Sequence, residues 1–440
     1  MKKVYIETYG CQMNVYDTEL VKAILDKHDF EFTDNEAEAE VVLLNTCSVR
    51  ENANRKVYNR IHQIKTRRNG DQVLIGILGC MATNFRQQLL KDPRLPIDFI
   101  AGPDSYKRLP GLIEEVAQTG KKSFDVTLSE FETYADVYPS RSGGVNAWIA
   151  VMRGCDNFCT FCVVPYTRGR ERSRDPENVV EEVQQLAAEG FRQVTLLGQN
   201  VNSYRYEDKD FAYLLERVST VDGIERIRFT SPHPKDFPNN LLQVIAENPK
   251  VCKQIHLPLQ AGNDRILEMM NRTYTQKEFL DLVDKIRTLI PDVVLTTDII
   301  VGFPTESDEE FEDTVKVVEQ VQFDSAFIFK YSERPKTVAA RRFPDDVPDE
   351  VKTERIVRLN DIQKKISYQK NLAHVGQVHE VLIEEEKTKK SAEHFQGRND
   401  GNKIVIFPKG DYHKGQFVNV RILDATPHVL LGEVVSVLNK

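Results

Sequence analysis

The sequence predicts an α/β protein in three parts: an amino-terminal parallel α/β sheet domain, a central partial (β/α)6 TIM-like barrel and a carboxyl-terminal five-stranded β-barrel. Three observations predict this order. Apolar runs alternate with amphipathic segments up to about residue 120, six further apolar runs each precede a helix-like stretch, and the end of the chain holds only short β-branched runs. The domain boundaries that we expect are 2–118, 141–371 and 374–437.

The amino-terminal part has strands that are apolar on both faces, which is typical of a parallel sheet covered by helices. Helical spacing is clearest in two segments, Asp17–Lys27 and Glu51–Lys65. Residues 123–144 contain few apolar pairs and end in a proline- and glycine-rich stretch, so we expect a connector there. The expected strands are Val4–Ile6, Val41–Leu44 and Val73–Leu78.

The central part repeats a strand–helix unit six times, as in a barrel that stops short of the eight units of a full one. A helix start is visible where Asp175-Pro176-Glu177 precedes Val179–Ala188. The segment Pro344–Lys370 has a charged helical pattern and is expected to link the barrel to the last domain. The expected strands are Ala147–Met152, Val194–Leu197, Ile224–Phe229, Gln254–Leu259, Val293–Val301 and Ser325–Phe329, followed by Gly376–Ile383, Ser391–Gly397, Lys403–Phe407, Gln416–Leu423 and His428–Val437.

The composition of the 440 residues, 40% hydrophobic and 29% charged, is that of a globular protein and excludes a disordered or fibrous chain. A net charge of -8 does not indicate a nucleic-acid-binding protein, but it does not exclude one, because local basic patches and not total charge decide such binding. The sequence lacks a signal-peptide pattern and any run near the ~18 apolar residues of a membrane helix. We therefore expect a cytoplasmic monomer with no membrane contact.

The most informative stretch is Arg153-Gly-Cys155-Asp-Asn-Phe-Cys159-Thr-Phe-Cys162, directly after the first expected barrel strand. Catalytic loops of barrels lie at this carboxyl edge. Three thiolates suit an iron–sulfur cluster, and with no fourth ligand nearby one iron of a 4Fe-4S cube stays open to a substrate. One competing interpretation is a structural zinc site, which requires four protein ligands in a closed coordination shell. The other is that the three cysteines are simply small buried residues. The spacing favours the cluster.

Three further cysteines, Cys11, Cys47 and Cys80, each end an apolar run. If these runs are parallel strands of one sheet, the three thiols meet at its carboxyl edge, where open α/β sheets bind ligands. Gly10 and Gly79 allow tight turns beside two of them. Cysteine is also a common buried residue, but its recurrence at three strand ends indicates a second metal or cluster site. The seventh cysteine is expected in the core.

Other candidate residues are polar groups near expected strand ends. Four arginines at alternate positions would lie on one side of an extended segment and suit an anion such as RNA phosphate, unless they are solvated or paired with nearby acids. In the last barrel, the ring of Phe395 suits stacking on a base and the guanidinium of Arg398 suits a phosphate contact. His233 and His256 lie at expected strand ends and are open to a functional role, but a hydrogen-bonded structural role is the default expectation. The candidates for holding a cosubstrate are Gly198, Gln199, Asn200, Asp298 and Gly302, and those for RNA are Arg168, Arg170, Arg172, Arg174, Phe395 and Arg398.

The cysteine loop resembles the radical S-adenosylmethionine (SAM) superfamily, and the strand-end cysteines narrow the resemblance to its methylthiotransferases over essentially the whole chain. Lys336 and Thr305 depart from the family, since each replaces an expected glycine. The matching stretches are Tyr9-Gly-Cys11-Gln-Met-Asn14, Asn45-Thr-Cys47-Ser-Val-Arg50, Arg153 to Cys162, Pro165-Tyr-Thr-Arg-Gly-Arg170, Thr230-Ser-Pro-His-Pro234, His256-Leu-Pro-Leu-Gln260 and Asp298-Ile-Ile-Val-Gly-Phe-Pro304.

This resemblance implies a radical SAM barrel, a terminal TRAM barrel and two 4Fe-4S clusters. Cys155, Cys159 and Cys162 would hold the cluster that binds SAM and cleaves it to a 5′-deoxyadenosyl radical; Cys11, Cys47 and Cys80 would hold the auxiliary cluster that carries sulfur. The first motif is similar to the branch that methylthiolates carbon 2 of N6-isopentenyladenosine at position 37, in the tRNA anticodon loop. Two SAM molecules serve, one as methyl donor and one as radical source. No side-chain acid or base is assigned.

The partners implied are the tRNA anticodon stem-loop and an external electron donor. Two alternatives keep the chemistry and change the substrate, either to threonylcarbamoyl-adenosine in tRNA or to a ribosomal-protein aspartate. An alternative of another class is a non-catalytic iron–sulfur protein that binds RNA and senses redox state.

Overall fold

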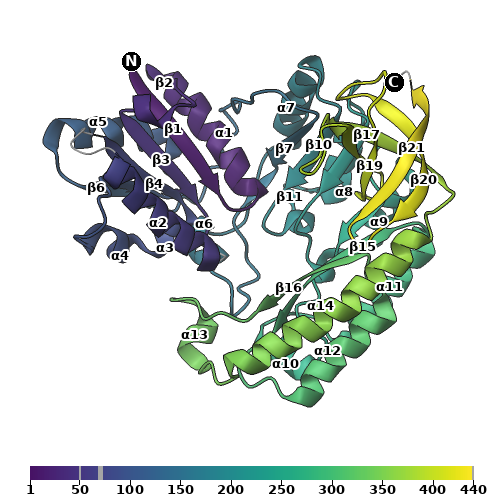
Figure 1. Ribbon diagram of the computed structural model, residues 1–440. Helices are drawn as coiled ribbons and strands as arrows, with labels where there is room; N and C mark the ends of the chain where they lie inside the picture. Colours follow the sequence, from purple (N-terminus) through teal and green to yellow (C-terminus); the bar gives the residue numbers. More distant parts are fainter. Residues whose placement is uncertain (49–50, 68–72, 439–440) are drawn as a thin grey trace.

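Three domains follow one another along the chain in the computed structural model, which describes residues 1–48, 51–67 and 73–438 (Figure 1). The amino-terminal and carboxyl-terminal domains lie on opposite sides of the central one. Val49 and Arg50, which end the second cysteine motif, fall outside the described residues, as do the side chains of 51–55. Among the described helices, none combines the length and the apolar character that a membrane span requires.

The amino-terminal domain is a six-stranded sheet in the order β2-β1-β3-β4-β5-β6, with every pair parallel. From β1 the chain passes to β2 at the edge of the sheet, and then crosses over to β3, which lies on the opposite side of β1. The carboxyl ends of β1 and β3 therefore form the switch point at which open α/β sheets bind ligands. The strands are β1 Lys2–Tyr9, β2 Phe30–Phe32, β3 Val41–Thr46, β4 Leu74–Gly79, β5 Phe99–Ala101 and β6 Ser123–Asp125.

Helices cover both faces of this sheet and give it two cores. Val4 and Leu43 face the core that includes Tyr16 of α1, whereas Val42 and Ile77 face the other, beneath Ile61 of α2. The alternation follows from the two-residue period of a strand. The helices are α1 Gln12–Asp26, α2 Glu51–Arg67, α3 Cys80–Asn84, α4 Arg86–Lys91 and α5 Leu109–Thr119, with 3-10 turns at Glu36–Glu38 and Tyr106–Arg108.

The central domain is a partial barrel of six parallel strands. Two parallel sheets, β13-β10-β7 and β14-β15-β16, are joined by the parallel bridge of Ile227 with Val251. The strands are β7 Asn146–Ala150, β10 Gln193–Leu197, β13 Arg226–Phe229, β14 Gln254–His256, β15 Val294–Val301 and β16 Ser325–Lys330. Short antiparallel pairs are β8 Met152–Arg153 with β9 Arg172–Ser173, and β11 Arg205–Tyr206 with β12 Lys209–Asp210.

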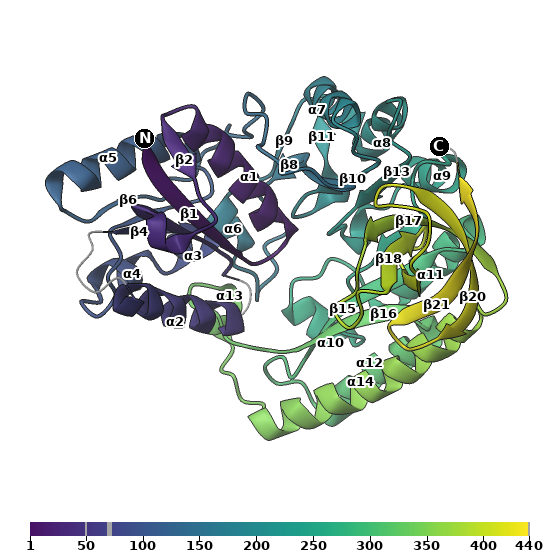
Figure 2. The ribbon, with the colours of Figure 1, turned by 45° about the horizontal axis from the view of Figure 1, so that its top comes forward.

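Most helices of this domain pack on the outside of the strands around one large apolar core, whereas α6 packs against α3 of the amino-terminal domain (Figure 2). The long helix α14 packs against β16 and α12 and then contacts β20 of the last domain, which confirms the expected helical link. The helices are α6 Val164–Arg168, α7 Pro176–Ala188, α8 Phe211–Ser219, α9 Asn239–Glu247, α10 Asp264–Met269, α11 Gln276–Leu289, α12 Asp308–Val321, α13 Val338–Arg342 and α14 Asp349–Leu372, with 3-10 turns at Val201–Ser203 and Pro234–Asp236.

The carboxyl-terminal domain is a closed barrel in the order β17-β18-β19-β21-β20. Two buried arginines of β13, Arg226 and Arg228, hold it against the central domain. Their guanidinium groups donate to main-chain oxygens of the small barrel, at 2.6–2.9 Å. The acceptors are the carbonyls of Glu380, Arg398, Asn399 and Asp400. The strands are β17 Val378–Glu385, β18 His394–Asn399, β19 Ile404–Pro408, β20 Phe417–Ala425 and β21 Val429–Leu438.

The structure confirms the predicted fold class and adds strands that the sequence pattern did not indicate. β5 and β6 have three residues each, too short for a periodicity to register, and β6 lies at the start of the expected connector. The first helix also begins earlier than predicted, at Gln12, because Cys11 caps it. The sheet therefore extends to Asp125, past the expected boundary at 118.

Two loops contain non-glycine residues in the left-handed region of the backbone map. Thr305 has φ 67° and Lys336 has φ 73°, the positions at which the family resemblance led us to expect glycine. A side chain at such a φ costs about 1–2 kcal/mol, and β-branched threonine is the less suited of the two. The loops keep the glycine-type conformation although the glycines are absent. Contacts hold Thr305 in place: its N–H donates to Asp346 and its carbonyl accepts from Arg265.

Replacing Thr305 by glycine is expected to give a protein about 1 kcal/mol more stable than Thr305→Ala. Both changes remove the hydroxyl and keep the two main-chain hydrogen bonds, so the comparison isolates the backbone strain. Urea unfolding of the two variants measures the difference. Equal stabilities would mean that the loop relaxes and stores no strain.

Candidate iron–sulfur sites

The first cysteine group lies at the carboxyl edge of the amino-terminal sheet. Cys11 follows β1, Cys47 follows β3 and Cys80 follows β4 as the first residue of α3. Cys47 and Cys80 are buried, whereas Cys11 is exposed. Neighbouring parallel strands thus bring three residues that are far apart in sequence to the switch point of the sheet.

Asn14 connects the ends of these strands. Its Oδ1 lies 3.4 Å from both the main-chain nitrogen and the Sγ of Cys11, and its Nδ2 donates to Asn45 Oδ1 and to the Thr46 carbonyl. The strands approach so closely that a Cβ on Gly10 would lie 2.5 Å from Asn14 Oδ1. Gly10 also has φ 147°, so the expectation that a glycine permits this tight turn is confirmed.

Arg168 brings a positive charge to the first cysteine group. Its Nε donates to Cys80 Sγ at 3.2 Å, and its buried Nη1 has no hydrogen-bond partner among the described residues. A hydrogen bond from Cys47 and the charge of Arg168 outweigh the effect of burial and lower the pKa of Cys11 to about 6. One thiol of the group is therefore readily ionised, which is the state that binds metal.

The second cysteine group occupies the loop between β8 and α6. Gly154 has φ 81°, and a Cβ there would lie 1.9 Å from the carbonyl oxygen of Arg170, so this turn requires glycine. The loop is fastened to the helix α10 end by Thr160, whose N–H and hydroxyl donate to the carbonyls of Met270 and Met269. The three thiols are thereby held at the carboxyl end of the first barrel strand, as predicted.

A cavity of about 180 Å³ lies beside these cysteines, inside the barrel. Its wall includes Gln199, which follows β10, and Asp298 of β15, two of the residues expected to hold a cosubstrate. Asp298 pairs with His256 at 3.2 Å, and Gln199 Oε1 accepts from the Gly154 N–H at 2.5 Å. The other lining residues are Cys155, Asn157, Cys159, Phe161, Cys162, Val164, Ser231, Pro232, His233, His256, Pro258, Gln260 and Arg272.

Arg272 brings a positive charge to the second cysteine group, as Arg168 does to the first. It is buried, and its Nη1 donates to Cys159 Sγ at 3.3 Å while its Nε donates to the hydroxyl of Tyr274. Burial lowers the pKa of His233 to about 2, with help from the positive charges of Arg272 and Lys235. The cavity wall therefore presents a neutral imidazole beside a permanent cation.

Both cysteine groups fit an iron–sulfur cluster by the chemistry of their donors. Each offers three thiols and one buried arginine N–H directed at a cysteine sulfur, and hydrogen bonds to sulfur stabilise such clusters and set their potentials. Within the described residues, no three Cys, His, Asp or Glu side chains converge on one ion-sized position. A 4Fe-4S cube binds one thiolate at each of three irons, so its ligands need not meet at one point.

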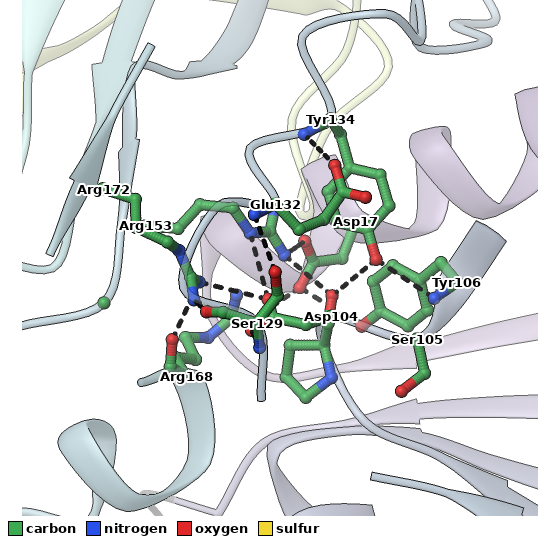
Figure 3. A network of polar contacts seen from close by, with 12 residues as sticks. Asp17, Asp104, Ser105, Tyr106, Ser129, Glu132, Tyr134, Arg153, Arg168 and Arg172 are labelled. Atoms are coloured by element: carbon green, nitrogen blue, oxygen red, sulfur yellow. Dashed lines mark hydrogen bonds and ion pairs between the residues drawn. The ribbon is translucent and has the colours of Figure 1, made fainter. Parts of the chain in front are cut away.

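A buried ionic network joins the two domains that carry these cysteines (Figure 3). Asp17 of α1 is fully buried and accepts from Arg153 Nη2 at 2.8 Å and from Arg168 Nη2 at 2.7 Å. Burial alone would raise the pKa of Asp17, but the two arginines outweigh it and lower the pKa. Beside it, Arg172 binds both carboxylate oxygens of Asp104.

The network sets the two cysteine groups next to each other. Arg153 lies two residues before Cys155, and Arg168 contacts Cys80, so Asp17 connects both loops. The helices α3 and α6 also pack together. From the central domain, Arg334 donates to the Ser48 carbonyl and Lys336 to the Asn84 carbonyl, which closes the junction on the other side.

Three residues expected near the cosubstrate do not line the cavity. Gly198 packs against Met152, where a Cβ would lie 2.7 Å from Cγ. Asn200 is buried and donates to Asp236. The Gly302 N–H donates to Glu306, and the residue lies against Lys352. These three positions support the strand ends on which Gln199 and Asp298 are carried.

Burial speaks against the predicted RNA contacts of four residues. Arg168, Arg172 and Arg174 are buried in ion pairs, the last with Glu182, because α6 and the turn at Gly169 break the extended conformation that would have aligned them on a surface. Phe395 belongs to the core of the small barrel, since its position in β18 faces inward. Arg170 is exposed and pairs with Asp156, and Arg398 is half-buried and pairs with Glu384.

Arg272 and Asp17 are components of the site that no sequence pattern indicates. Neither belongs to a recognisable motif, and each acts on a group more than a hundred residues away in the chain. His233 and His256 both line the cavity, although a hydrogen-bonded structural role was the default expectation for each.

Comparison with known proteins agrees with this arrangement. Residues 149–318 match the model of the Radical SAM superfamily, residues 3–102 that of the Uncharacterized protein family UPF0004, and residues 373–435 that of the TRAM domain. Fold and site thus define a radical SAM enzyme with an additional cysteine-bearing domain and a TRAM domain.

Similar proteins show to which family of radical SAM enzymes the chain belongs. The chain is 48% identical to the tRNA-2-methylthio-N(6)-dimethylallyladenosine synthase of Porphyromonas gingivalis, over 99% of this chain and 95% of that protein. It is 46% identical to the synthase of the same name from Chloroherpeton thalassium, over 98% and 95%. The protein belongs to the tRNA-2-methylthio-N(6)-dimethylallyladenosine synthase family.

Solved structures share the fold at low identity. The radical SAM methyltransferase TsrM from Kitasatospora setae superposes with a TM-score of 0.58 at 15% identity, covering 77% of this chain and 75% of TsrM. The cobalamin-dependent radical SAM enzyme OxsB gives 0.51 at 12% identity, covering 83% and 56%.

Replacing Asp17 by asparagine is expected to lower the free energy of unfolding by about 3 kcal/mol, because the buried guanidinium groups of Arg153 and Arg168 lose the carboxylate that they share. Urea unfolding measures the loss. Asp281→Asn is the matched control: Asp281 forms an exposed helical pair with Lys277, worth less than about 1 kcal/mol. An equal effect of the two substitutions would contradict a role for Asp17 in joining the domains.

The His233 imidazole is expected to stay neutral between roughly pH 5 and 8, because its pKa lies near 2, well below that of histidine in an unfolded chain. Its share of the folding free energy is full above the unfolded pKa and is lost as the pH falls. Histidine-labelled NMR spectra measure this, with His233→Asn identifying the signal. A His233 signal that titrates within this range would show that the side chain is solvated.

Proposed function

We propose that this protein methylthiolates carbon 2 of N6-isopentenyladenosine at position 37 of tRNA. The observation that carries the proposal is the junction of two three-cysteine groups, each with a buried arginine on one sulfur, in a chain that matches the synthases over almost its whole length. The inferred cofactors are two 4Fe-4S clusters and SAM. An external electron donor and a monomeric enzyme are part of the same proposal.

We assign the cofactors to the two cysteine groups and the adjoining cavity. Cys155, Cys159 and Cys162 would ligate the radical-forming cluster, which supplies a 5′-deoxyadenosyl radical from SAM to act on an inert C–H bond. SAM would lie in the adjoining cavity, where the carboxylate of Asp298 and the amide of Gln199 offer an acceptor and a donor for its polar groups. Cys11, Cys47 and Cys80 would ligate the auxiliary cluster.

The remaining side chains prepare the site for these groups. Arg168 and Arg272 offset the negative charge of thiolates in a buried setting, where an uncompensated charge is costly. Asp17 fixes Arg168 and Arg153 together, so the two cysteine loops keep one spacing. The neutral His233 adds no positive charge of its own to the cavity wall beside Arg272.

A base must leave the stack of the anticodon loop to reach this cavity. Single-stranded loops allow such extrusion, and small β-barrels commonly present a face to RNA. Because Phe395 is a core residue and Arg398 is paired, we infer RNA contact through other exposed residues of the TRAM domain.

Replacing Cys11, Cys47 and Cys80 together by alanine is expected to remove about half of the iron and sulfide and to abolish methylthio product, while reductant-dependent formation of 5′-deoxyadenosine continues. Iron and sulfide counts and product chromatography on anaerobically reconstituted protein measure this, with prenylated anticodon stem-loop RNA as substrate. The matched control replaces Cys252, a buried cysteine outside both groups, and should keep iron and product.

Different outcomes would overturn different parts of the proposal. Full iron in the triple variant would mean that these cysteines hold no cluster. Product from threonylcarbamoyl-adenosine RNA or from a ribosomal-protein aspartate, but not from prenylated RNA, would change the substrate. If the wild-type protein forms no 5′-deoxyadenosine, the enzyme proposal fails and a redox sensor remains.

A further inference from the structure

Strand β16 exposes two phenylalanines on one face. Along Ser325–Lys330 the residues alternate between exposed and half-buried, and the exposed set includes Phe327, at 56% exposure, and Phe329, at 38%. Ile328, on the alternate face, packs against the core of the central domain. A phenyl ring in water forgoes the burial that makes aromatic residues stabilising, so packing within this domain does not account for the pair.

The exposed face of β16 is the inner face of the open barrel. Strand register places Phe327 opposite Asp298 and Phe329 opposite Ile300. Asp298 lines the cavity beside the second cysteine group. The ring of Phe327 also lies 6.3 Å from that of His256, another wall residue of the same cavity.

The apolar face is therefore continuous with the candidate site. In the described part of the chain, β16 is the last strand of its sheet and pairs on one side alone, so this is where the partial barrel opens. A molecule that enters the cavity through the opening passes the two phenyl rings. The nearest cavity residue in register is a carboxylate, Asp298, which repels an anionic group carried into this position.

We propose that Phe327 and Phe329 form a subsite for the five-carbon dimethylallyl chain on N6 of the substrate adenine. This inference rests on the proposed function and adds the basis of substrate choice. Burying a branched hydrocarbon chain against apolar rings contributes favourable binding free energy, whereas an unmodified amino group gains little from the same contact. The rings and Asp298 together disfavour the carboxylate of a threonylcarbamoyl group. The two rings are thus the place at which this chain distinguishes prenylated from unmodified RNA.

The test compares two anticodon stem-loop RNAs, one with N6-isopentenyladenosine and one with unmodified adenosine at the target position. Fluorescence anisotropy gives the dissociation constant of each RNA without turnover. Wild-type protein should bind the prenylated RNA more tightly. Phe327→Ala and Phe329→Ala should each reduce this preference by about tenfold, with the affinity for unmodified RNA nearly unchanged.

Two control variants separate a specific contact from a loss of fold. Phe327→Leu keeps an apolar side chain and should retain most of the preference. Leu289→Ala removes a side chain of similar exposure, 40%, at the end of α11 and should change neither affinity. Circular dichroism and iron content of every variant should match the wild type.

The outcomes distinguish this inference from the proposed function. If wild-type protein forms methylthio product but the alanine variants keep the full prenyl preference, the subsite is wrong and the function stands. If the alanine variants lose affinity equally for both RNAs, the subsite is wrong and the two rings make a general RNA contact. If the variants change the affinity for neither RNA, the subsite is also wrong and the exposed face is a binding surface for a polypeptide. If no RNA yields product while prenyl-dependent binding is lost in the variants, the function fails and the subsite stands.

Discussion

The rest of the structure depends on the buried carboxylate of Asp17. A charge with no exposed surface is tolerated only when it is paired and hydrogen-bonded, and Asp17 meets two guanidinium groups from the central domain. One of these, Arg153, precedes the cysteine loop of the barrel, and the other, Arg168, reaches a cysteine of the sheet domain. A single side chain thus fixes the relation between two sites that different domains build, and replacing it by a neutral group would leave two buried cations.

The two cysteine groups share a chemical design although their surroundings differ. One is assembled from three strand ends of a doubly wound sheet and the other from a single loop, yet each receives one buried arginine hydrogen bond on sulfur. Cations beside thiolates favour the ionised form that binds iron. Burial raises the pKa of Cys80 and Cys162, and the neighbouring cation, Arg168 at Cys80 and Arg272 at Cys162, partly offsets that rise.

Much of this arrangement could be predicted from sequence because strand geometry is regular. Three cysteines that each end an apolar run must share an edge if the strands are parallel, and they do so in the structure. The arginines after the loop were misjudged, since alternation predicts a common face only in an extended chain and Gly169 turns the backbone. Asp17 and Arg272 could not be found in this way, because their partners lie on distant elements and long-range pairing leaves no local pattern.

The attachment of the last domain has a consequence for how such chains diverge. Arg226 and Arg228 donate to main-chain oxygens of the small barrel, and every residue type supplies a carbonyl. The side chains at the acceptor positions can therefore drift through evolution while the docking geometry persists. The exposed surface of the barrel can change in the same way without loosening its anchorage.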